Sequence, residues 1–404
     1  MDKVDAAPGR TAWTLALCFL AALAEGFDVQ SMGVAAPRMA PTLALTRDQL
    51  GPVFSASIVG LLVGAVLIGR LADRVGRRWT LIASLVVLGV FSFATVWAWD
   101  LTSLLVIRLL AGLGLGGAMP NLIALSAESV GETRRPLIVT LATAGMPFGA
   151  ASAGAVAAVA GWRDIFHVGA ALPLGLAAVM IAALPESPRF MAVRSGDATS
   201  GGGGTGAGLP QVLFGQGRAA TTLLLWSASF AALLTLYLLL NWLPTLMSVK
   251  GVAATHASLV SMLFNLGGAV GVLTLAPLLD RGRRGRTMGI WYACTAASLV
   301  GLAWAGADLA SAGAAGFAAG AFVSAAPLML YGLAPGFYAV VMRGSGTGAM
   351  VGVGRVGAIL GPLLAAALLG LGFGASGVLL ALLPLVALAA AATLTLFSRP
   401  TVAD

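Results

Sequence analysis

The chain has 404 residues, of which 59% are hydrophobic and only 9% are charged, and its mean hydropathy is +0.97. A soluble protein of this length needs far more charged residues to cover its surface, so the composition excludes a soluble globular protein. The formal net charge of +8 does not indicate a nucleic-acid partner, because the basic residues lie mainly at the ends of apolar segments.

Twelve apolar segments follow one another along the chain. Each supplies the roughly 20 residues that a helix needs to cross a hydrocarbon core of about 30 Å. They are continuously apolar rather than alternating, which excludes the strands of a membrane β-barrel. The sequence therefore predicts an all-α membrane protein with twelve transmembrane helices, at residues 12–37, 49–72, 78–98, 102–127, 136–160, 165–184, 219–247, 255–279, 287–306, 309–335, 343–371 and 375–397.

The basic residues indicate how these helices are oriented. If the N-terminus lies in the cytosol, most Arg and Lys residues fall at cytosolic ends and loops. The residues on the opposite side are then Arg38, Arg47, Arg163 and Lys250. Because positive charge accumulates on the cytosolic side of membrane proteins, both termini are predicted to be cytosolic.

The longest cytosolic connection covers residues 185–218 and contains the run Ser200–Gly204, whose composition is typical of a flexible linker. It separates an N-terminal bundle of six helices, residues 1–184, from a C-terminal bundle of six helices, residues 219–404. The sequence therefore predicts two domains joined by this linker.

A weak internal repeat supports the same division. Leu71-Ala72-Asp73-Arg74 closes the second span, and Leu278-Leu279-Asp280-Arg281 closes the eighth. Parallel, pseudo-symmetric halves are one of the repeat schemes found in secondary transporters.

Between the second and third spans the chain reads Gly69-Arg70-Leu71-Ala72-Asp73-Arg74-Val75-Gly76-Arg77-Arg78. The glycines permit a tight turn, and Asp73 can face the positive end of a helix or pair with an arginine. This segment resembles the signature loop of the major facilitator superfamily. The resemblance implies the major facilitator fold, with two six-helix bundles. It also implies a role in gating between conformations for Gly69, Asp73, Arg74, Gly76, Arg77 and Arg78.

Two carboxylic acids lie well inside the first span, in Glu25-Gly26-Phe27-Asp28. Their i, i+3 spacing places both on one face of the helix. Burial and mutual repulsion predict at least one carboxyl that gains and loses a proton near neutral pH, which is what proton coupling requires. The alternative is a salt bridge to Arg108 or Arg355, which favours the charged form.

Arg108 in the fourth span and Arg355 in the eleventh are basic residues inside apolar segments. Arg108 lies about 10 Å into its span, and Arg355 lies nearer the middle of its own. A charge in a bilayer is costly and normally faces a cavity or a partner. Both arginines are therefore candidates for substrate binding, and a structural ion pair is the alternative for each.

These residues also resemble a narrower family, the aromatic acid:proton symporters. Glu25-Gly26-Phe27-Asp28 is similar to the Asp-Gly-x-Asp motif of their first span, with Glu in place of the first Asp. Met119–Leu122, Pro185–Ser187, Arg343–Gly348 and Gly354–Ala358 fit the same family. The resemblance covers nearly the whole chain. It implies import of a small aromatic carboxylate, such as 3-(3-hydroxyphenyl)propionate or a hydroxybenzoate, together with protons.

An aromatic carboxylate needs a fixed cation and a pocket with apolar or aromatic walls and a few polar groups. An arginine can present two parallel donors to the carboxylate. The candidates for contact with the rest of the substrate are Phe27, Asn121, Asn241, Tyr331 and Tyr338. Asn and Tyr side chains can equally well tie helices together.

Other functions are less consistent with the sequence. It has no Walker sequence for a nucleotide, which argues against ATP as the energy source. Cys18 and Cys294 lie in different spans and suggest no metal cluster, and no cofactor or enzymatic activity is expected. A sugar porter, a drug exporter and a solute sensor remain as alternatives. The expected protein is a monomer in the bacterial inner (plasma) membrane that binds no nucleic acid.

Overall fold

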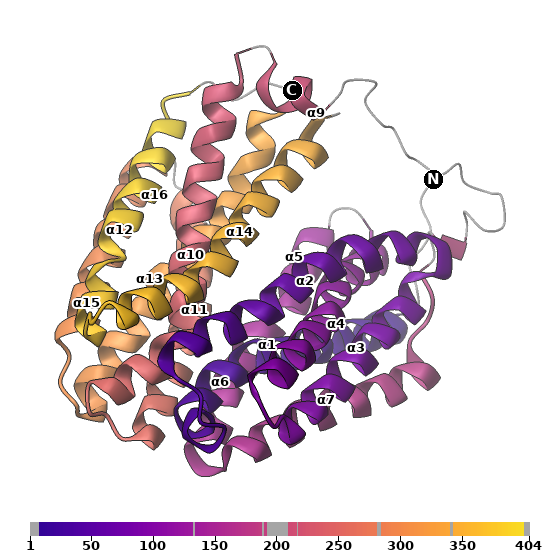
Figure 1. Cartoon of the computed structure of the whole chain (residues 1–404). Helices are drawn as coiled ribbons and strands as arrows, with labels where there is room; N and C mark the ends of the chain where they lie inside the picture. The colour runs from indigo at the N-terminus through magenta and orange to yellow at the C-terminus, as the bar shows by residue number, and fades with distance from the viewer. Residues whose placement is uncertain are drawn as a thin grey trace. The chain divides into compact units, whose positions relative to one another are not determined.

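The computed structural model describes residues 8–131, 134–187, 190–191, 209–215, 217–280, 284–339 and 342–399. Within these residues, twelve segments are helical, long enough and apolar enough to cross a membrane, as the sequence predicts. The chain divides into two compact units, Met1–Gly201 and Gly202–Asp404. Each unit is a bundle of helices (Figure 1). Of the predicted linker, residues 188–189, 192–208 and 216 lie outside the described part of the chain.

The first unit contains six spans. Their elements are α1 (Pro8–Thr42), α2 (Arg47–Val75), α3 (Arg77–Ala94) with the 3₁₀ turn η1 (Thr95–Trp97), α4 (Leu101–Glu128), α5 (Arg135–Thr143) followed by α6 (Gly145–Val159), and α7 (Trp162–Ala183).

The second unit begins with a short helix that falls within the predicted linker. The elements are α9 (Leu209–Phe214), α10 (Ala219–Val249), α11 (Ala254–Asp280), α12 (Arg284–Trp304), α13 (Leu309–Leu333) with the 3₁₀ turn η3 (Ala334–Phe337), α14 (Arg343–Gly370), and α15 (Ala375–Leu380) followed by α16 (Leu383–Leu396).

Two spans that the sequence predicts as single helices are interrupted. The helix predicted at residues 136–160 ends at Thr143 and resumes at Gly145. Pro147 has no N–H group to donate to the carbonyl of Thr143, which explains the break. The last span is interrupted after Leu380 for the same reason, because Pro384 follows four residues later.

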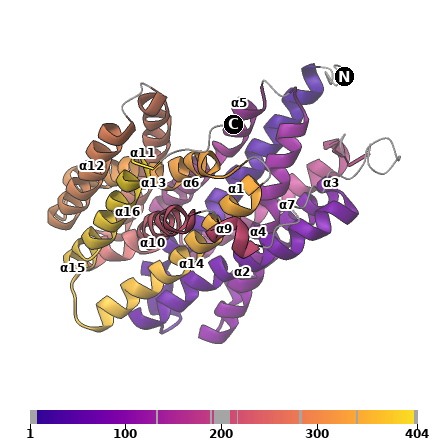
Figure 2. The same ribbon diagram turned by 90° about the horizontal axis from the view of Figure 1, so that it is seen from above.

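Each unit holds equivalent pairs of spans in close contact. The second and fourth spans pack together as α2 and α4, and their counterparts in the other unit pack as α11 and α13. The first and fifth spans pack as α1 and α6, and their counterparts as α10 and α14 (Figures 1 and 2). The helices approach so closely at these glycines that any side chain would collide with the neighbouring backbone. A Cβ at Gly112 would lie 2.1 Å from the carbonyl oxygen of Ser57, and one at Gly320 would lie 1.8 Å from that of Phe264. The shared pairing is what two pseudo-symmetric bundles require.

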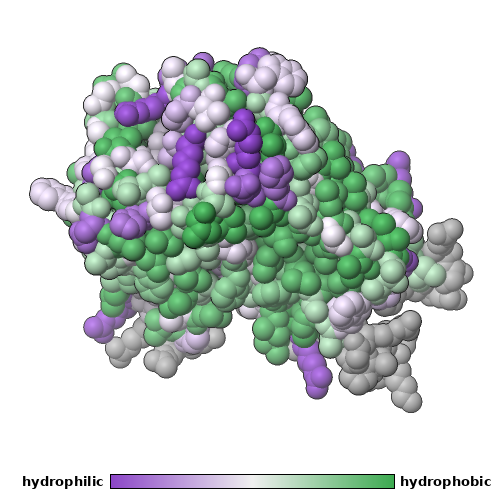
Figure 3. Space-filling view, turned by 90° about the horizontal axis from the view of Figure 1, so that it is seen from below, coloured by the Kyte–Doolittle hydropathy of each residue, from purple (hydrophilic) through white to green (hydrophobic). Residues whose placement is uncertain are grey.

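Large apolar side chains remain exposed on the bundles. Val159 is 89% exposed, Leu273 is 67% exposed and Trp304 is 79% exposed. Hydrophobic residues cover broad parts of the surface visible in Figure 3. An apolar surface of this extent is unfavourable in water and is expected where helices face lipid.

Candidate functional site

The first unit contains a buried ion pair between α1 and α4. Asp28 lies near the middle of α1, and Arg108 lies about two turns into α4. Nη2 of Arg108 donates to Oδ2 of Asp28 at 2.7 Å, and Nη1 donates to Oδ1 at 3.3 Å. The two side chains are 1% and 0% exposed. This pair is the salt bridge that the sequence analysis gave as the alternative for this acid, with Arg108 rather than Arg355 as the partner.

Two serines and a phenylalanine surround the pair. Oγ of Ser92 in α3 donates to Oδ1 of Asp28, and Oγ of Ser57 in α2 accepts from Nε of Arg108 at 3.0 Å. The ring centroid of Phe166 in α7 lies 5.8 Å from the guanidinium carbon. A buried ion pair is tolerated only when further hydrogen bonds satisfy its polar groups. Five helices thus contribute to one polar cluster, which we call the Asp28–Arg108 cluster.

The other predicted residues of α1 are also buried. Glu25 lies one turn before Asp28 and is 2% exposed. Phe27 is 1% exposed and packs against α7, where a Cβ at Gly169 would lie 3.3 Å from its ring. The Phe27 side chain therefore fills the space that this glycine leaves between α1 and α7.

Both predicted asparagines use their amide group on their own helix. Nδ2 of Asn121 donates to the carbonyl of Gly117 at 2.7 Å, and Nδ2 of Asn241 donates to the carbonyl of Tyr237 at 2.8 Å. Asn121 lies thirteen residues after Arg108, about 20 Å further along α4, and so stands apart from the Asp28–Arg108 cluster.

In the second unit, Arg355 lies near the middle of α14 and reaches a tyrosine of α10. Its Nη1 donates to the hydroxyl oxygen of Tyr237 at 2.7 Å, and its guanidinium carbon lies 5.9 Å from the centroid of that ring. Tyr331 of α13 is close enough to interact electrostatically with both Arg355 and Tyr237. Asn241 lies one turn beyond Tyr237 on α10. Three predicted residues, Arg355, Tyr331 and Asn241, are therefore gathered around Tyr237.

Tyr338 lies elsewhere in this unit. Its hydroxyl is 3.0 Å from Oγ1 of Thr222, at the start of α10, and its ring would lie 2.6 Å from a Cβ at Gly346. Thr222 and Tyr237 are fifteen residues apart on α10, about 22 Å. Burial raises the pKa of Tyr338, and the hydrogen bond with Thr222 and the charge of Arg218 act in the opposite direction. The contacts of Tyr338 are those of a residue that holds helix ends together.

The predicted gating loop turns at Gly76, which has φ of 104°. Its conformation is one that residues with a side chain avoid, and a Cβ there would lie 2.4 Å from Oε2 of Glu186. Oε1 of Glu186 accepts from the backbone N–H groups of Arg77 and Arg78, at 3.0 Å each. A carboxylate therefore lies at the N-terminus of α3, where the helix dipole favours negative charge.

The arginines of this loop bind other parts of the first unit. Nη1 of Arg77 lies 3.2 Å from Oε1 of Glu128 at the end of α4. Nη2 of Arg78 donates to the carbonyl of Ile181 in α7 at 2.5 Å. Gly69 and Arg74 lie within α2, where Arg74 is exposed. The side chain of Asp73, which belongs to the same prediction, is outside the described part of the structure.

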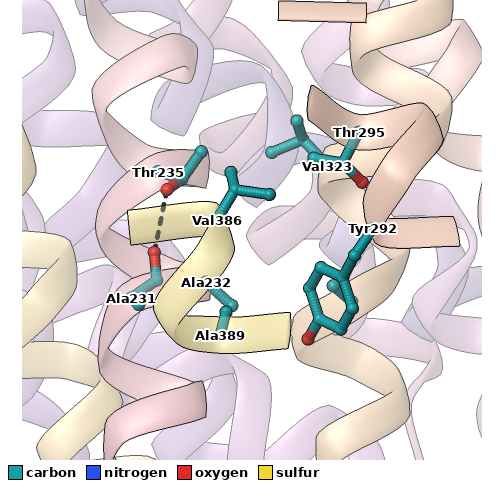
Figure 4. Close-up of a pocket in the computed structure, with 9 residues that line it drawn as sticks. Ala231, Ala232, Thr235, Tyr292, Thr295, Val323, Val386 and Ala389 are labelled. Atoms are coloured by element: carbon teal, nitrogen blue, oxygen red, sulfur yellow. Dashed lines mark hydrogen bonds between the residues drawn. The ribbon is translucent and has the colours of Figure 1, made fainter. Parts of the chain in front are cut away.

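A small cavity lies in the second unit between α10, α12, α13 and α16 (Figure 4). Its volume is about 10 Å³, close to the minimum that admits one water molecule. The hydroxyls near it are engaged: Thr235 donates to the carbonyl of Ala231, Thr295 donates to that of Trp291, and the hydroxyl of Tyr292 pairs with Thr393. Ligand pockets are typically about 300–1,000 Å³, so this cavity is too small for an aromatic acid.

The sequence did not single out Ser57, Ser92 or Tyr237. Tyr237 carried a usable signal, because it is four residues from Asn241 and so shares a helix face with it. Ser57 and Ser92 carried none, since a serine within an apolar span is common and its partner depends on how the helices pack. Glu186 appeared only within a family motif, and its contact with the gating loop was not predicted.

Comparisons with known proteins agree on one family. The profile of the Major Facilitator Superfamily matches residues 18–307. The chain is 42% identical to the 3-(3-hydroxy-phenyl)propionate transporter of Escherichia coli K12, with 96% of this chain and 94% of that protein aligned. It is 36% identical to a gallate transporter of Pseudomonas putida, with 93% and 89% aligned. It is 34% identical to a 4-hydroxybenzoate transporter of the same species, with 92% and 89% aligned.

Solved structures show the same fold at low sequence identity. A bacterial homologue of the human lysosomal transporter Spinster, in an inward-facing and occupied conformation, matches with a TM-score of 0.77 and 15% identity, covering 98% of this chain and 100% of that one. A D-xylose–proton symporter matches with a TM-score of 0.76 and 16% identity, covering 96% and 98%. These relatives and neighbours are transporters, not enzymes.

Proposed function

The chain belongs to the Major Facilitator Superfamily and is a multi-pass membrane transporter, and from this premise we propose that it imports a small aromatic carboxylate together with protons. The relatives named above transport 3-(3-hydroxyphenyl)propionate, gallate and 4-hydroxybenzoate. These compounds share an aromatic ring, a carboxylate and at least one phenolic hydroxyl. The proposed substrate class is therefore a hydroxylated aromatic acid, with 3-(3-hydroxyphenyl)propionate as the first compound to test.

The Asp28–Arg108 cluster is the observation that carries this proposal. When Asp28 is charged, it occupies two donors of Arg108, and the guanidinium is neutralised. Protonation of Asp28 removes the charge that neutralises the guanidinium, so that the positive charge of Arg108 is free to attract an anionic substrate. Proton binding and anion binding then favour each other, which is the thermodynamic requirement for symport. Glu25, one turn away and also buried, is the second proposed proton carrier.

Arg355 is the proposed second contact for the substrate. It lies near the middle of a span, in contact with Tyr237 and close to Tyr331 and Asn241, and a charged residue at such a position commonly serves a substrate or coupling role. Phe27, Asn121 and Tyr338 remain candidates from the sequence. The contacts of Asn121 and Tyr338, described above, support structural roles better than substrate binding.

The transport cycle that we propose is alternating access between two bundles, residues 1–184 and 219–404, joined by the linker 185–218. The loop Gly69–Arg78 is proposed to gate this movement, and its ties to Glu128 and Glu186 hold it in a fixed position on the first unit. We further propose a monomer in the bacterial inner membrane with both termini in the cytosol, on the strength of the positive-inside distribution of Arg and Lys.

Uptake by proteoliposomes tests the function. Purified protein is reconstituted, and uptake of labelled 3-(3-hydroxyphenyl)propionate is followed with the outside acidic, before and after an uncoupler collapses the gradient. Accumulation that disappears with the gradient is the expected result. No uptake under an intact gradient would reject this substrate, whereas uptake that ignores the gradient would reject proton coupling and leave the substrate in place.

Two variants assign the coupling to the Asp28–Arg108 cluster. Asp28→Asn is expected to lose accumulation driven by the proton gradient. Asp164→Asn, an exposed acid of the same unit, is expected to behave like the unaltered protein. Full gradient-driven accumulation by Asp28→Asn would exclude Asp28 as a coupling residue.

A further inference from the structure

The contact between Arg355 and Tyr237 has a fixed direction. A guanidinium has donors only, so the hydroxyl oxygen of Tyr237 must be the acceptor in this 2.7 Å hydrogen bond. A phenol has a single proton, and that proton must therefore point away from Arg355. Among the described residues, the structure gives the Tyr237 hydroxyl no acceptor for it, although Tyr237 is only 6% exposed.

The backbone holds this arrangement in place. Gly354, next to Arg355, lets α14 approach α10 so closely that a Cβ there would lie 2.4 Å from Oγ of Ser229. Gly357 does the same on the following turn, where a Cβ would lie 2.3 Å from the carbonyl oxygen of Phe230. Because the two helices cannot separate without losing this contact, the guanidinium is held against Tyr237.

From these observations, and resting on the proposed function, we infer that Tyr237 is a substrate-binding residue. Its hydroxyl proton donates to the carboxylate of the aromatic acid, beside the guanidinium of Arg355. The hydrogen bond that Tyr237 accepts from a cation polarises its O–H group and makes it a stronger donor. A hydroxyl donor and a guanidinium side by side match the two oxygens of one carboxylate. Tyr237 thereby discriminates in favour of the acid against neutral compounds of the same shape.

Tyr331 is the proposed contact for the aromatic ring of such a ligand. It interacts electrostatically with both Arg355 and Tyr237, so it lies within electrostatic range of the proposed carboxylate position. Asn241, whose Nδ2 is committed to the carbonyl of Tyr237, still presents Oδ1 as an acceptor on the same face of α10. An acceptor there fits the phenolic hydroxyl that the transported compounds of the relatives share.

The test compares two ligands in two variants. Binding of 3-(3-hydroxyphenyl)propionate and of its neutral amide is measured on the purified full-length protein by isothermal titration calorimetry. Tyr237→Phe keeps the ring and removes the donor. Hydrogen bonds to a charged group are the stronger ones, so we expect affinity for the acid to fall about tenfold or more and affinity for the amide to fall less. In uptake, KM for the acid rises while kcat is retained.

The matched control is Tyr292→Phe, which removes another buried phenolic hydroxyl in the same unit, the one paired with Thr393 at 3.0 Å. It is expected to leave both affinities unchanged. If Tyr237→Phe does not accumulate in the membrane, 3-fluorotyrosine is incorporated at position 237; its more acidic hydroxyl is expected to raise the acid-to-amide affinity ratio.

The outcomes separate this inference from the proposed function. An unaltered protein that binds neither compound contradicts the proposed function and the inference with it. An unaltered protein that binds the acid, together with a Tyr237→Phe protein that has the same acid-to-amide ratio, overturns the inference alone. An equal loss of both affinities also overturns it, because that is the signature of a purely structural tyrosine.

Discussion

Removing one partner of the Asp28–Arg108 pair should be far more damaging than removing both. Asp28→Asn leaves the charge of Arg108 in a position that is 1% exposed, and Arg108→Gln leaves the charge of Asp28 in one that is 0% exposed. An uncompensated buried charge of this kind typically costs about 3–5 kcal/mol. In the double variant both groups are neutral amides, which can still bond to Ser57 and Ser92, so most of the lost stability should return.

Thermal unfolding in detergent measures this as a double-mutant cycle. For a unit of about 200 residues, 1 kcal/mol corresponds to about 2–4 °C in Tm, so each single variant should lose about 6–20 °C. The Tm of the double variant should be well above the value that the sum of the two single losses predicts. The control cycle uses Arg77 and Glu128, whose side chains are 24% and 13% exposed and whose coupling should be about 1 kcal/mol or less. Additive losses at Asp28 and Arg108 would refute the reasoning.

Two further predictions concern stability. Gly76→Ala should destabilise the protein by about 1–3 kcal/mol, because φ of 104° is strained for alanine and the added Cβ would collide with Glu186. Gly69→Ala is the control: Gly69 lies within a helix and a Cβ there would have nothing within 4 Å, so this variant should be neutral or stabilising. Equal Tm values for the two variants would contradict the prediction. Burial raises the pKa of Tyr338, so its contribution to stability is complete below the usual tyrosine value of about 10 and is lost as pH rises through the higher folded-state value. Tm should therefore fall above pH 10, and less steeply in Tyr338→Phe.

The spans could be predicted from the sequence because length and hydropathy alone decide whether a helix can cross a bilayer. The interruptions could not. Pro147 and Pro384 end helices, whereas Pro120 and Pro244 lie inside continuous ones. Neighbouring helices can satisfy the backbone groups that a proline frees, and a single sequence does not show whether such a neighbour exists.

The candidate residues were easier to name than to group. A charged residue within an apolar span stands out, so Asp28, Arg108 and Arg355 were found at once. Their partners depend on which faces of the helices meet. The spans are apolar on all sides, and a helix of that kind has no polar stripe to show which face is turned inward. The pairing of Asp28 with Arg108, and the position of Tyr237 against Arg355, therefore required the tertiary structure.

The order of the spans along the chain has a consequence for biosynthesis. Asp28 precedes Arg108 by 80 residues, which is about 4–16 s at 5–20 residues per second. During this interval α1 is completed while Arg108 is still missing, and α6, which packs most extensively against α1, is made later still. Until Arg108 is made, the carboxylate of Asp28 has no cationic partner. The insertion machinery is therefore expected to keep this residue out of contact with lipid. Errors of membrane insertion are therefore expected mainly before the first unit of this transporter is complete.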